Sequence, residues 1–183
     1  YDTLTGLPNQ SLFMGRLEQE MRARGGEAAG ALALVDLQRF RAINEALGHQ
    51  GGNEILAQVA QRLAGALSGT ERLARMTSDK FAVALPSLSD PAAVAPTVET
   101  LVLGCFRTAF TAGGRELRIA ARVGVAVYPA DGNRAGALLL NAEAALKRAK
   151  TAGEQFLFYA AEMNARAAHV LSMESKLRSA VQH

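Results

Sequence analysis

Apolar residues recur along this chain with two different spacings, and each change of spacing marks the boundary of an expected element. Spacings of three and four residues are typical of one face of a helix, whereas short apolar or alternating runs are typical of strands. The helical pattern predicts helices at 11–25, 39–48, 52–67, 91–110, 135–150 and 162–182. The strand pattern predicts strands at 31–37, 113–129 and 155–159, and a two-stranded hairpin within 73–85.

The order of these elements indicates the fold class. Helices and strands follow each other in mixed order, and an antiparallel hairpin lies among them. Such an order favours an α+β protein in which a mixed β-sheet is flanked by helices. The 183 residues, 49% of them hydrophobic and 20% charged, suffice for one compact domain of ordinary globular composition.

Charge and cysteine content exclude several classes of protein. The formal charge is only +3 and the 20 Lys and Arg residues are scattered, which argues against a nucleic-acid-binding surface. The single cysteine, Cys105, excludes an intrachain disulfide framework. No apolar run approaches the ~20 residues that span a bilayer, and no signal-peptide pattern is present. We expect a cytoplasmic domain without membrane contact, excised from a longer protein that could itself be membrane-attached.

Two carboxylates are candidates for chemistry. Asp36 ends the most apolar predicted strand, and Asp79 lies at the tip of the predicted hairpin, beside Thr77 and Ser78. If the hairpin pairs beside the Asp36 strand, both acids project from the same end of the sheet and could hold Mg²⁺ on a nucleoside triphosphate. The alternatives are a helix N-cap for Asp36 and a plain turn residue for Asp79.

The helix that follows Asp36 carries a second candidate pair. Arg41 and Asn44 are three residues apart and share one helix face. An arginine can bind a phosphate with two parallel hydrogen bonds, and an amide can read a base edge. The alternative is an ordinary solvated helix face.

Five blocks of sequence, taken together, resemble one family. The blocks are DTLTGLPNQ, DLQRFRAINEALGHQGGNEIL, ARMTSDKFAVAL, VGVAVYPADG and AEAALKRAKTAGEQ. Their order and spacing, from about Tyr1 to Tyr159, resemble the GGDEF domain of diguanylate cyclases. The resemblance implies a fold similar to the nucleotidyl cyclase and polymerase palm, and a reaction that joins two GTP molecules into cyclic di-GMP across a dimer.

The hairpin departs from the family's motif, because TSDKF stands in the place of GGDEF. Thr77 and Ser78 replace glycines that let the backbone approach phosphates and accept positive φ. Asp79 and Asp36 match the metal-binding acids, but Lys80 replaces the catalytic glutamate. The resemblance therefore implies no catalytic residue, and a metal site at Asp36 and Asp79 that is weak or unoccupied.

The remaining family positions are partly kept. Gln38 replaces a second acid, Asn53 replaces an aspartate that reads guanine, and Glu154 replaces a basic residue. Asn44 matches the guanine-reading asparagine, and Arg41 and Lys150 match residues that contact phosphates. The resemblance thus assigns these candidate nucleotide-binding residues: Asn44, Asn53, Arg41, Lys150, Thr77 and Ser78. Alternatively, the retained residues act only as caps or solvated charges.

Lys80 has a possible structural role of its own. Its ammonium would repel a divalent ion and could neutralise Asp36 and Asp79 in the absence of metal. The hypothesis is a metal-free acidic pocket closed by Lys80 as an internal cation. Strand alternation could instead direct Lys80 into solvent.

These residues predict a degenerate, non-catalytic GGDEF regulatory domain at 1–160 that binds GTP weakly or not at all. No cofactor is expected, with Mg²⁺ only if GTP binds. The segment 161–183 resembles the helix that connects such domains to a C-terminal EAL-type phosphodiesterase domain. Glu174 interrupts its heptad-like apolar seam, which predicts a monomer or weak homodimer. The alternatives are an active diguanylate cyclase and a nucleotide-free dimerisation scaffold.

Overall fold

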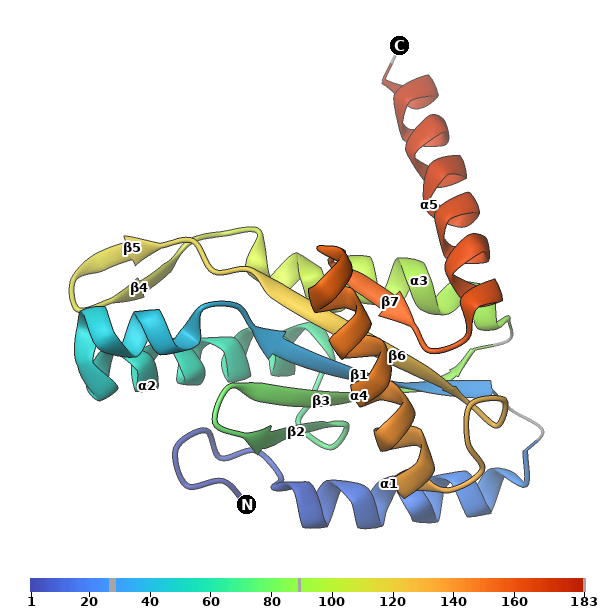
Figure 1. Ribbon diagram of the computed structural model, residues 1–183, viewed down its shortest axis with the longest axis horizontal. Coiled ribbons are helices and arrows are strands. Elements are labelled where there is room, and N and C mark those ends of the chain that lie inside the picture. The colour runs from blue at the N-terminus through green and yellow to red at the C-terminus, as the bar shows by residue number, and fades with distance from the viewer. Residues whose placement is uncertain (27–28, 89, 183) are drawn as a thin grey trace.

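A five-stranded sheet in the order β2–β3–β1–β6–β7 forms the centre of the protein (Figure 1). The strands are β1 (Ala29–Leu37), β2 (Leu73–Thr77), β3 (Lys80–Leu88), β6 (Ala121–Tyr128) and β7 (Phe156–Phe158). The central β1 is antiparallel to both β3 and β6, whereas β7 adds to β6 in parallel. The computed structural model describes residues 1–26, 29–88 and 90–182. The predicted α+β class, with a mixed sheet flanked by helices, is confirmed.

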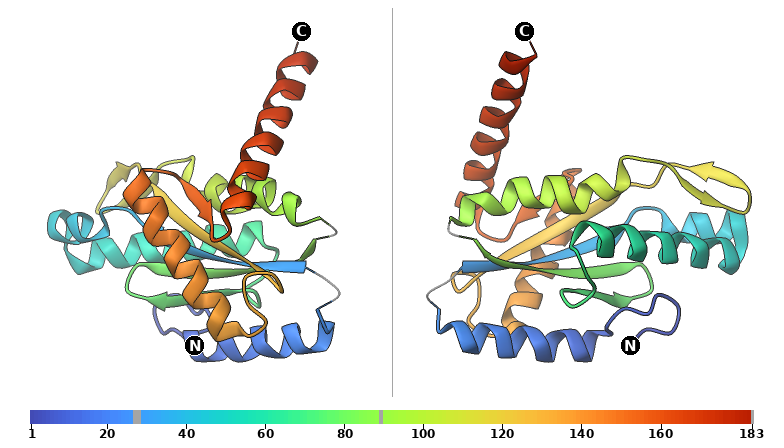
Figure 2. Two further views of the ribbon diagram at one scale, coloured as in Figure 1. Left: turned by 45° about the vertical axis from the view of Figure 1, so that its right-hand side comes forward. Right: turned by 180° about the vertical axis from the view of Figure 1, so that it is seen from behind.

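Helices cover both faces of this sheet, as the two views of Figure 2 show. The main helices are α1 (Gln10–Arg24), α2 (Phe40–Ala66) and α4 (Ala135–Ala152). Alternation along β1 sends Leu32 and Leu34 into the core under α1 and α4, and Ala33 and Val35 into the core under α2. Because both faces are buried, β1 is apolar at nearly every position, as expected of a central strand.

The two helices predicted at 39–48 and 52–67 form one element with a kink. Gly48 has φ 71° and ψ 174°, a conformation that glycine adopts without steric penalty. Beyond the kink, a Cβ on Gly52 would lie 3.2 Å from the Phe40 ring and would clash with the Asn44 side chain. Glycine at this position therefore lets the Asn44 amide lie against the second half of the helix.

The prediction for 91–129 is wrong in two places. The helix expected at 91–110 is a series of short pieces: a 3-10 turn (Pro91–Ala93), α3 (Val94–Thr97), a π turn (Val98–Val102) and a 3-10 turn (Leu103–Phe106). Pro96 lacks an N–H and so disrupts regular helical hydrogen bonding. The single strand expected at 113–129 is divided, because β4 (Phe110–Ala112) and β5 (Arg115–Leu117) form a separate hairpin before β6.

The terminal helix α5 (Ala161–Val181) projects away from the rest of the protein (Figure 1). Met163 and Ala167 are buried at its base, whereas Met173, Leu177 and Val181 are 50%, 64% and 85% exposed. Only the first part of the expected apolar seam therefore packs on this domain. Within the described ranges, no helix combines the length and the hydropathy that crossing a membrane requires.

Candidate nucleotide site

Asp36 occupies the buried end of the central strand. It follows Leu32 and Leu34 on the face covered by α4, and only 3% of its surface is exposed. It does not cap the following helix, because Arg39 is the N-cap residue of α2. A buried carboxylate needs a compensating charge or hydrogen bonds, so the surroundings of Asp36 determine what this end of the sheet can bind.

The β2–β3 hairpin lies beside Asp36, as predicted. Lys80 is opposite Asp36 in the register of β3 with β1, and the Leu37 N–H donates to the Asp79 carbonyl oxygen at 3.2 Å. Asp36 and Asp79 therefore lie at the same end of the sheet. Thr77 and Ser78 are exposed at the tip. Neither has positive φ, since Arg39 and Ser68 are the non-glycine residues with positive φ in the described ranges. Replacing the two glycines therefore causes no positive-φ strain at this tip.

The N-terminal loop supports the hairpin from outside the sheet. The Arg75 guanidinium donates to both carboxylate oxygens of Asp2, at 3.2 and 3.1 Å, and to the Ser78 carbonyl at 2.9 Å. Partial burial alone would raise the pKa of Asp2, but hydrogen bonds from Thr5 and the Arg75 guanidinium lower this pKa below its usual value. The hairpin tip is thereby held in place without glycines.

Helix α4 brings a cation onto Asp36. Gly124 of β6 lies directly under this helix, so that a Cβ there would clash with backbone atoms of Ala142 and Leu146. This close packing places Lys150 over the end of β1, where its ammonium forms an ion pair with Asp36 Oδ2. The Asp36 side chain is 4% exposed and that of Lys150 41%. Among the described residues, that oxygen accepts no further hydrogen bond, so the ion pair compensates its burial.

Two more cations flank Asp36 within the sheet. Lys80 of β3 and Arg122 of β6 are its direct partners in the two antiparallel ladders, and directly opposite residues share one face of a sheet. Arg122 also donates to the Gly153 carbonyl, at 3.0 Å, at the end of α4. No ion pair of Lys80 is found in the described part of the chain. The hypothesis that Lys80 neutralises Asp36 is therefore wrong. The residue that pairs with Asp36 is Lys150, on α4.

The resemblance implies a divalent ion between Asp36 and Asp79, and the residues present do not fit one. One carboxylate oxygen of Asp36 is already paired with an ammonium, and two further cations stand on either side of it. Gln38, at the place of a second acid, donates to the Asp36 carbonyl at 3.5 Å. The described residues contain no group of three or more His, Cys, Asp or Glu side chains that could hold a metal. A divalent cation would have to displace the Lys150 ammonium to bind Asp36.

The candidate base-reading residues lie at the kink of α2. The Asn44 amide packs against Gly52, and the exposed Asn53 is the next residue along the helix. Arg41, by contrast, is exposed and pairs with Glu45 at 3.1 Å. In this structure Arg41 is therefore a solvated residue on the helix surface, which was the alternative interpretation. Lys150, the other predicted phosphate ligand, is engaged by Asp36.

Arg122 is the residue of this site that the sequence interpretation missed. In the run RVGVAVY it shares the period-two face of Gly124, Ala126 and Tyr128. A charged residue at the start of such a buried face, at the same sheet end as Asp36, is the signal that could have found it.

Known proteins share both the sequence and this fold. Residues 1–156 match the family model described as "Diguanylate cyclase, GGDEF domain". The chain is 35% identical to the bifunctional diguanylate cyclase/cyclic di-GMP phosphodiesterase MucR of Pseudomonas aeruginosa, across 100% of this chain and 27% of that protein. It is 33% identical to the cyclic di-GMP phosphodiesterase NbdA of the same bacterium, across 99% of this chain and 23% of NbdA.

A solved structure extends the comparison. Truncated TpbB (also called YfiN) of Pseudomonas aeruginosa, comprising only the GGDEF domain, superposes with a TM-score of 0.79 at 30% identity. The match covers 94% of this chain and 99% of that one. The chain spans about a quarter of the length of MucR and NbdA. It belongs to the GGDEF family of diguanylate cyclase domains and is a domain of cyclic di-GMP signalling.

Proposed function

We propose that this GGDEF domain is a non-catalytic regulatory module that binds GTP weakly or not at all. The observation that carries the proposal is the Lys150–Asp36 ion pair, set in the row formed by Lys80, Asp36 and Arg122. A metal-dependent phosphoryl-transfer site needs negative side chains to hold its cations. Here the Lys150 ammonium is already paired with the buried acid, and Lys80 stands where the family has its catalytic glutamate.

Residual nucleotide binding rests on the amides at the kink of α2. The amides of Asn44, which packs against Gly52, and of Asn53 can accept and donate hydrogen bonds. An amide lacks the charge of the aspartate that Asn53 replaces, so its hydrogen bonds to guanine N–H groups are weaker. We therefore propose base recognition without productive placement of the phosphates.

The partner in this proposal is a C-terminal EAL-type domain of the full-length protein, in the cytoplasm. Both MucR and NbdA carry "cyclic di-GMP phosphodiesterase" in their names and are far longer than this chain. The distal half of α5, with Leu177 and Val181 exposed, supports a continuation toward a further domain. The isolated chain is proposed to be a monomer or weak homodimer.

The test is an assay of product formation. The purified chain is incubated with GTP and Mg²⁺ or Mn²⁺, and cyclic di-GMP is measured by mass spectrometry, with the full-length diguanylate cyclase TpbB in parallel as a positive control. We expect no product from this chain. Product that scales with its concentration and disappears in Asp79→Ala would overturn the proposal in favour of an active cyclase, which the shared sheet end of Asp36 and Asp79 would then explain.

A second assay separates weak nucleotide binding from an empty scaffold. GTP titration is followed by melting temperature, since a ligand that binds the native state raises it. A rise that is lost in Asn44→Ala supports the nucleotide-binding module. No rise at any accessible GTP concentration supports the scaffold.

A further inference from the structure

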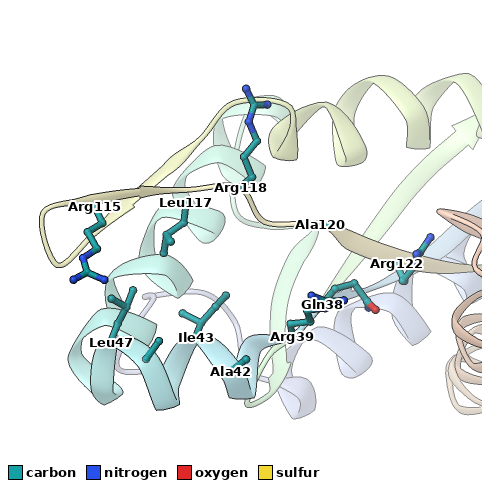
Figure 3. Close-up of a pocket in the computed structure, with 11 residues that line it drawn as sticks. Gln38, Arg39, Ala42, Ile43, Leu47, Arg115, Leu117, Arg118, Ala120 and Arg122 are labelled. Atoms are coloured by element: carbon teal, nitrogen blue, oxygen red, sulfur yellow. The ribbon is translucent and has the colours of Figure 1, made fainter.

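A concavity on α2 borders the Asp36 site at one end, where Gln38 and Arg122 line it. It has a volume of about 670 Å³ and is enclosed by the first half of α2, the β4–β5 hairpin and the segment leading into β6 (Figure 3). Its apolar floor includes Ile43, Leu47 and Leu117. The size is within the roughly 300–1,000 Å³ typical of small-molecule sites.

This cavity uses a different side of α2 from the nucleotide candidates. Its lining positions Arg39, Ile43 and Leu47 are four residues apart and therefore share one helix stripe. Arg41 and Asn44 do not belong to that stripe and do not line the cavity. A ligand here would not occupy the positions of the predicted guanine site.

The far wall of the cavity is fixed by polar contacts with α2. Gln58 exchanges two hydrogen bonds with the Thr111 backbone, at 2.5 and 3.1 Å, and Glu54 accepts from the Gly113 N–H at 3.1 Å. Arg62 donates to the Thr108 and Ala109 carbonyls, at 2.9 and 2.6 Å. These contacts hold the β4–β5 hairpin along the second half of α2. The cavity is therefore formed before any ligand arrives, which favours binding.

Arginines dominate the rim, and no acidic residue lines the cavity. Arg118 and Arg122 each donate to a backbone carbonyl, of Arg107 and Gly153. The guanidinium groups of Arg39 and Arg115 form no hydrogen bond or ion pair with any residue in the ranges 1–26, 29–88 and 90–182. Figure 3 shows Arg115 extending from the hairpin toward Leu47, while Arg118 points away. The cavity thus has uncompensated positive charge beside an apolar floor.

We propose that this cavity binds a small organic anion made of a planar apolar ring and a phosphate or carboxylate group. A guanidinium binds such anionic groups through two parallel hydrogen bonds and stacks on flat rings. Arg115, which extends toward Leu47 in Figure 3, is placed to hold the anionic group, and Ile43, Leu47 and Leu117 receive the ring. Because the ligand binds the folded protein, it stabilises that state.

The probe for this site is 2-naphthyl phosphate, titrated by calorimetry at low ionic strength. Inorganic phosphate and 2-naphthol are titrated separately as controls, because the first has only the anionic group and the second only the apolar ring. We expect 2-naphthyl phosphate to bind at least about tenfold more tightly than either half, since the two contributions add in one ligand. Equal affinity for naphthyl phosphate and inorganic phosphate would overturn the proposal, as would no binding up to millimolar concentration.

Substitutions locate the binding. Arg115→Ala is expected to weaken 2-naphthyl phosphate by about tenfold or more, as loss of a charge-assisted pair does. Arg115→Lys keeps the charge but not the planar guanidinium, so its affinity for the probe should lie between those of wild type and Arg115→Ala. Arg166→Ala, at an exposed position on α5, is the matched control and should change nothing. If Arg41→Ala weakens the probe and Arg115→Ala does not, the probe binds in the nucleotide cleft and the proposal is wrong.

Discussion

The two hairpins of this protein treat charge in opposite ways. Beside β2–β3, Asp36 at the end of β1 is buried and paired with Lys150, and the hairpin tip is tied to the N-terminal loop through Arg75. At β4–β5, the backbone is tied to α2, but the guanidinium of Arg115, like that of Arg39 at the start of α2, forms no hydrogen bond or ion pair with another described residue. The first hairpin carries the family motif and its central charge is satisfied internally. The second carries no motif and has charge available for a ligand.

This difference also predicts where substitutions will hurt. Removing one partner of a buried ion pair leaves an uncompensated charge, which is strongly destabilising. Removing an exposed arginine whose guanidinium has no partner, such as Arg115, leaves no buried charge or hydrogen-bonding group without a partner. The Asp36 cleft should therefore respond to substitution with lost stability, and the arginine-rimmed cavity mainly with lost binding.

Gly124→Ala should have the largest effect, because it removes the packing that places Lys150 over Asp36. The new Cβ would overlap the backbone of α4 at Ala142 and Leu146, which cannot move as a side chain can. We expect a loss of more than about 3 kcal/mol, as for severe overpacking, measured by urea denaturation. Gly136→Ala, in open space on the same helix, is the matched control and should be neutral or slightly stabilising. Similar stabilities for the two variants would contradict the account.

Lys150→Met should have the next largest effect. It removes the cation paired with Asp36 while keeping the apolar part of the side chain, and we expect a loss of about 2 kcal/mol, reduced from a fully buried pair by the exposure of Lys150. Adding Asp36→Asn should recover part of this loss in a double-mutant cycle. Lys147→Met, at an exposed position on the same helix, is the control. Additive effects of the two substitutions would show that the pair does not couple.

Lys80→Glu should convert the site toward the family pattern. A second carboxylate directly opposite Asp36 repels it, so the variant should be about 1 kcal/mol less stable than wild type without metal. Mg²⁺ should then raise its melting temperature while leaving that of the wild type unchanged. Lys80→Gln distinguishes loss of the cation from gain of the acid. A variant as stable as wild type and indifferent to Mg²⁺ would count against this interpretation.

The smallest effect concerns the other end of α4. Glu18 of α1 accepts a hydrogen bond from the Ala135 N–H at 2.7 Å, and this bond, with Arg22 and Arg134 nearby, lowers the pKa of Glu18 below the usual value of a glutamate. A lowered pKa contributes stability above the unfolded value that is lost as the pH falls through the folded value. Wild type should therefore lose melting temperature below about pH 4.5 more steeply than Glu18→Gln. Parallel pH profiles would contradict this.

Much of the fold follows from the sequence, because local patterns determine it. The run before Asp36 is apolar on both faces and forms β1, and the alternation around Thr77–Lys80 forms β2 and β3. The β4–β5 hairpin was missed although Gly113–Gly114 is a turn signal, because the residues after it continue the apolar run of β6. The breaks in the helix near Pro96 were also missed, because the apolar residues on both sides keep a helical spacing.

The sequence predicts which acids lie at the site better than it predicts which cation pairs with them. Strand ends placed Asp36 and Asp79 together, since register follows from the apolar pattern. The cation that reaches Asp36 depends on how closely α4 approaches the sheet, which is set by tertiary contact at Gly124. Lys80 and Lys150 both have long, flexible side chains, so sequence spacing alone does not separate them. The structure separates them by the position of one helix.

Direct measurement of metal binding tests the central claim, that internal cations take the place of a divalent ion at Asp36. Electron paramagnetic resonance of Mn²⁺ distinguishes free from bound ion, and wild type, Lys80→Glu and Asp36→Asn are compared without nucleotide. The account predicts that wild type and Asp36→Asn bind no Mn²⁺, so that neither reduces the free-ion signal. Lys80→Glu should bind the ion and reduce this signal. Stoichiometric Mn²⁺ binding by wild type that disappears in Asp36→Asn would contradict the account.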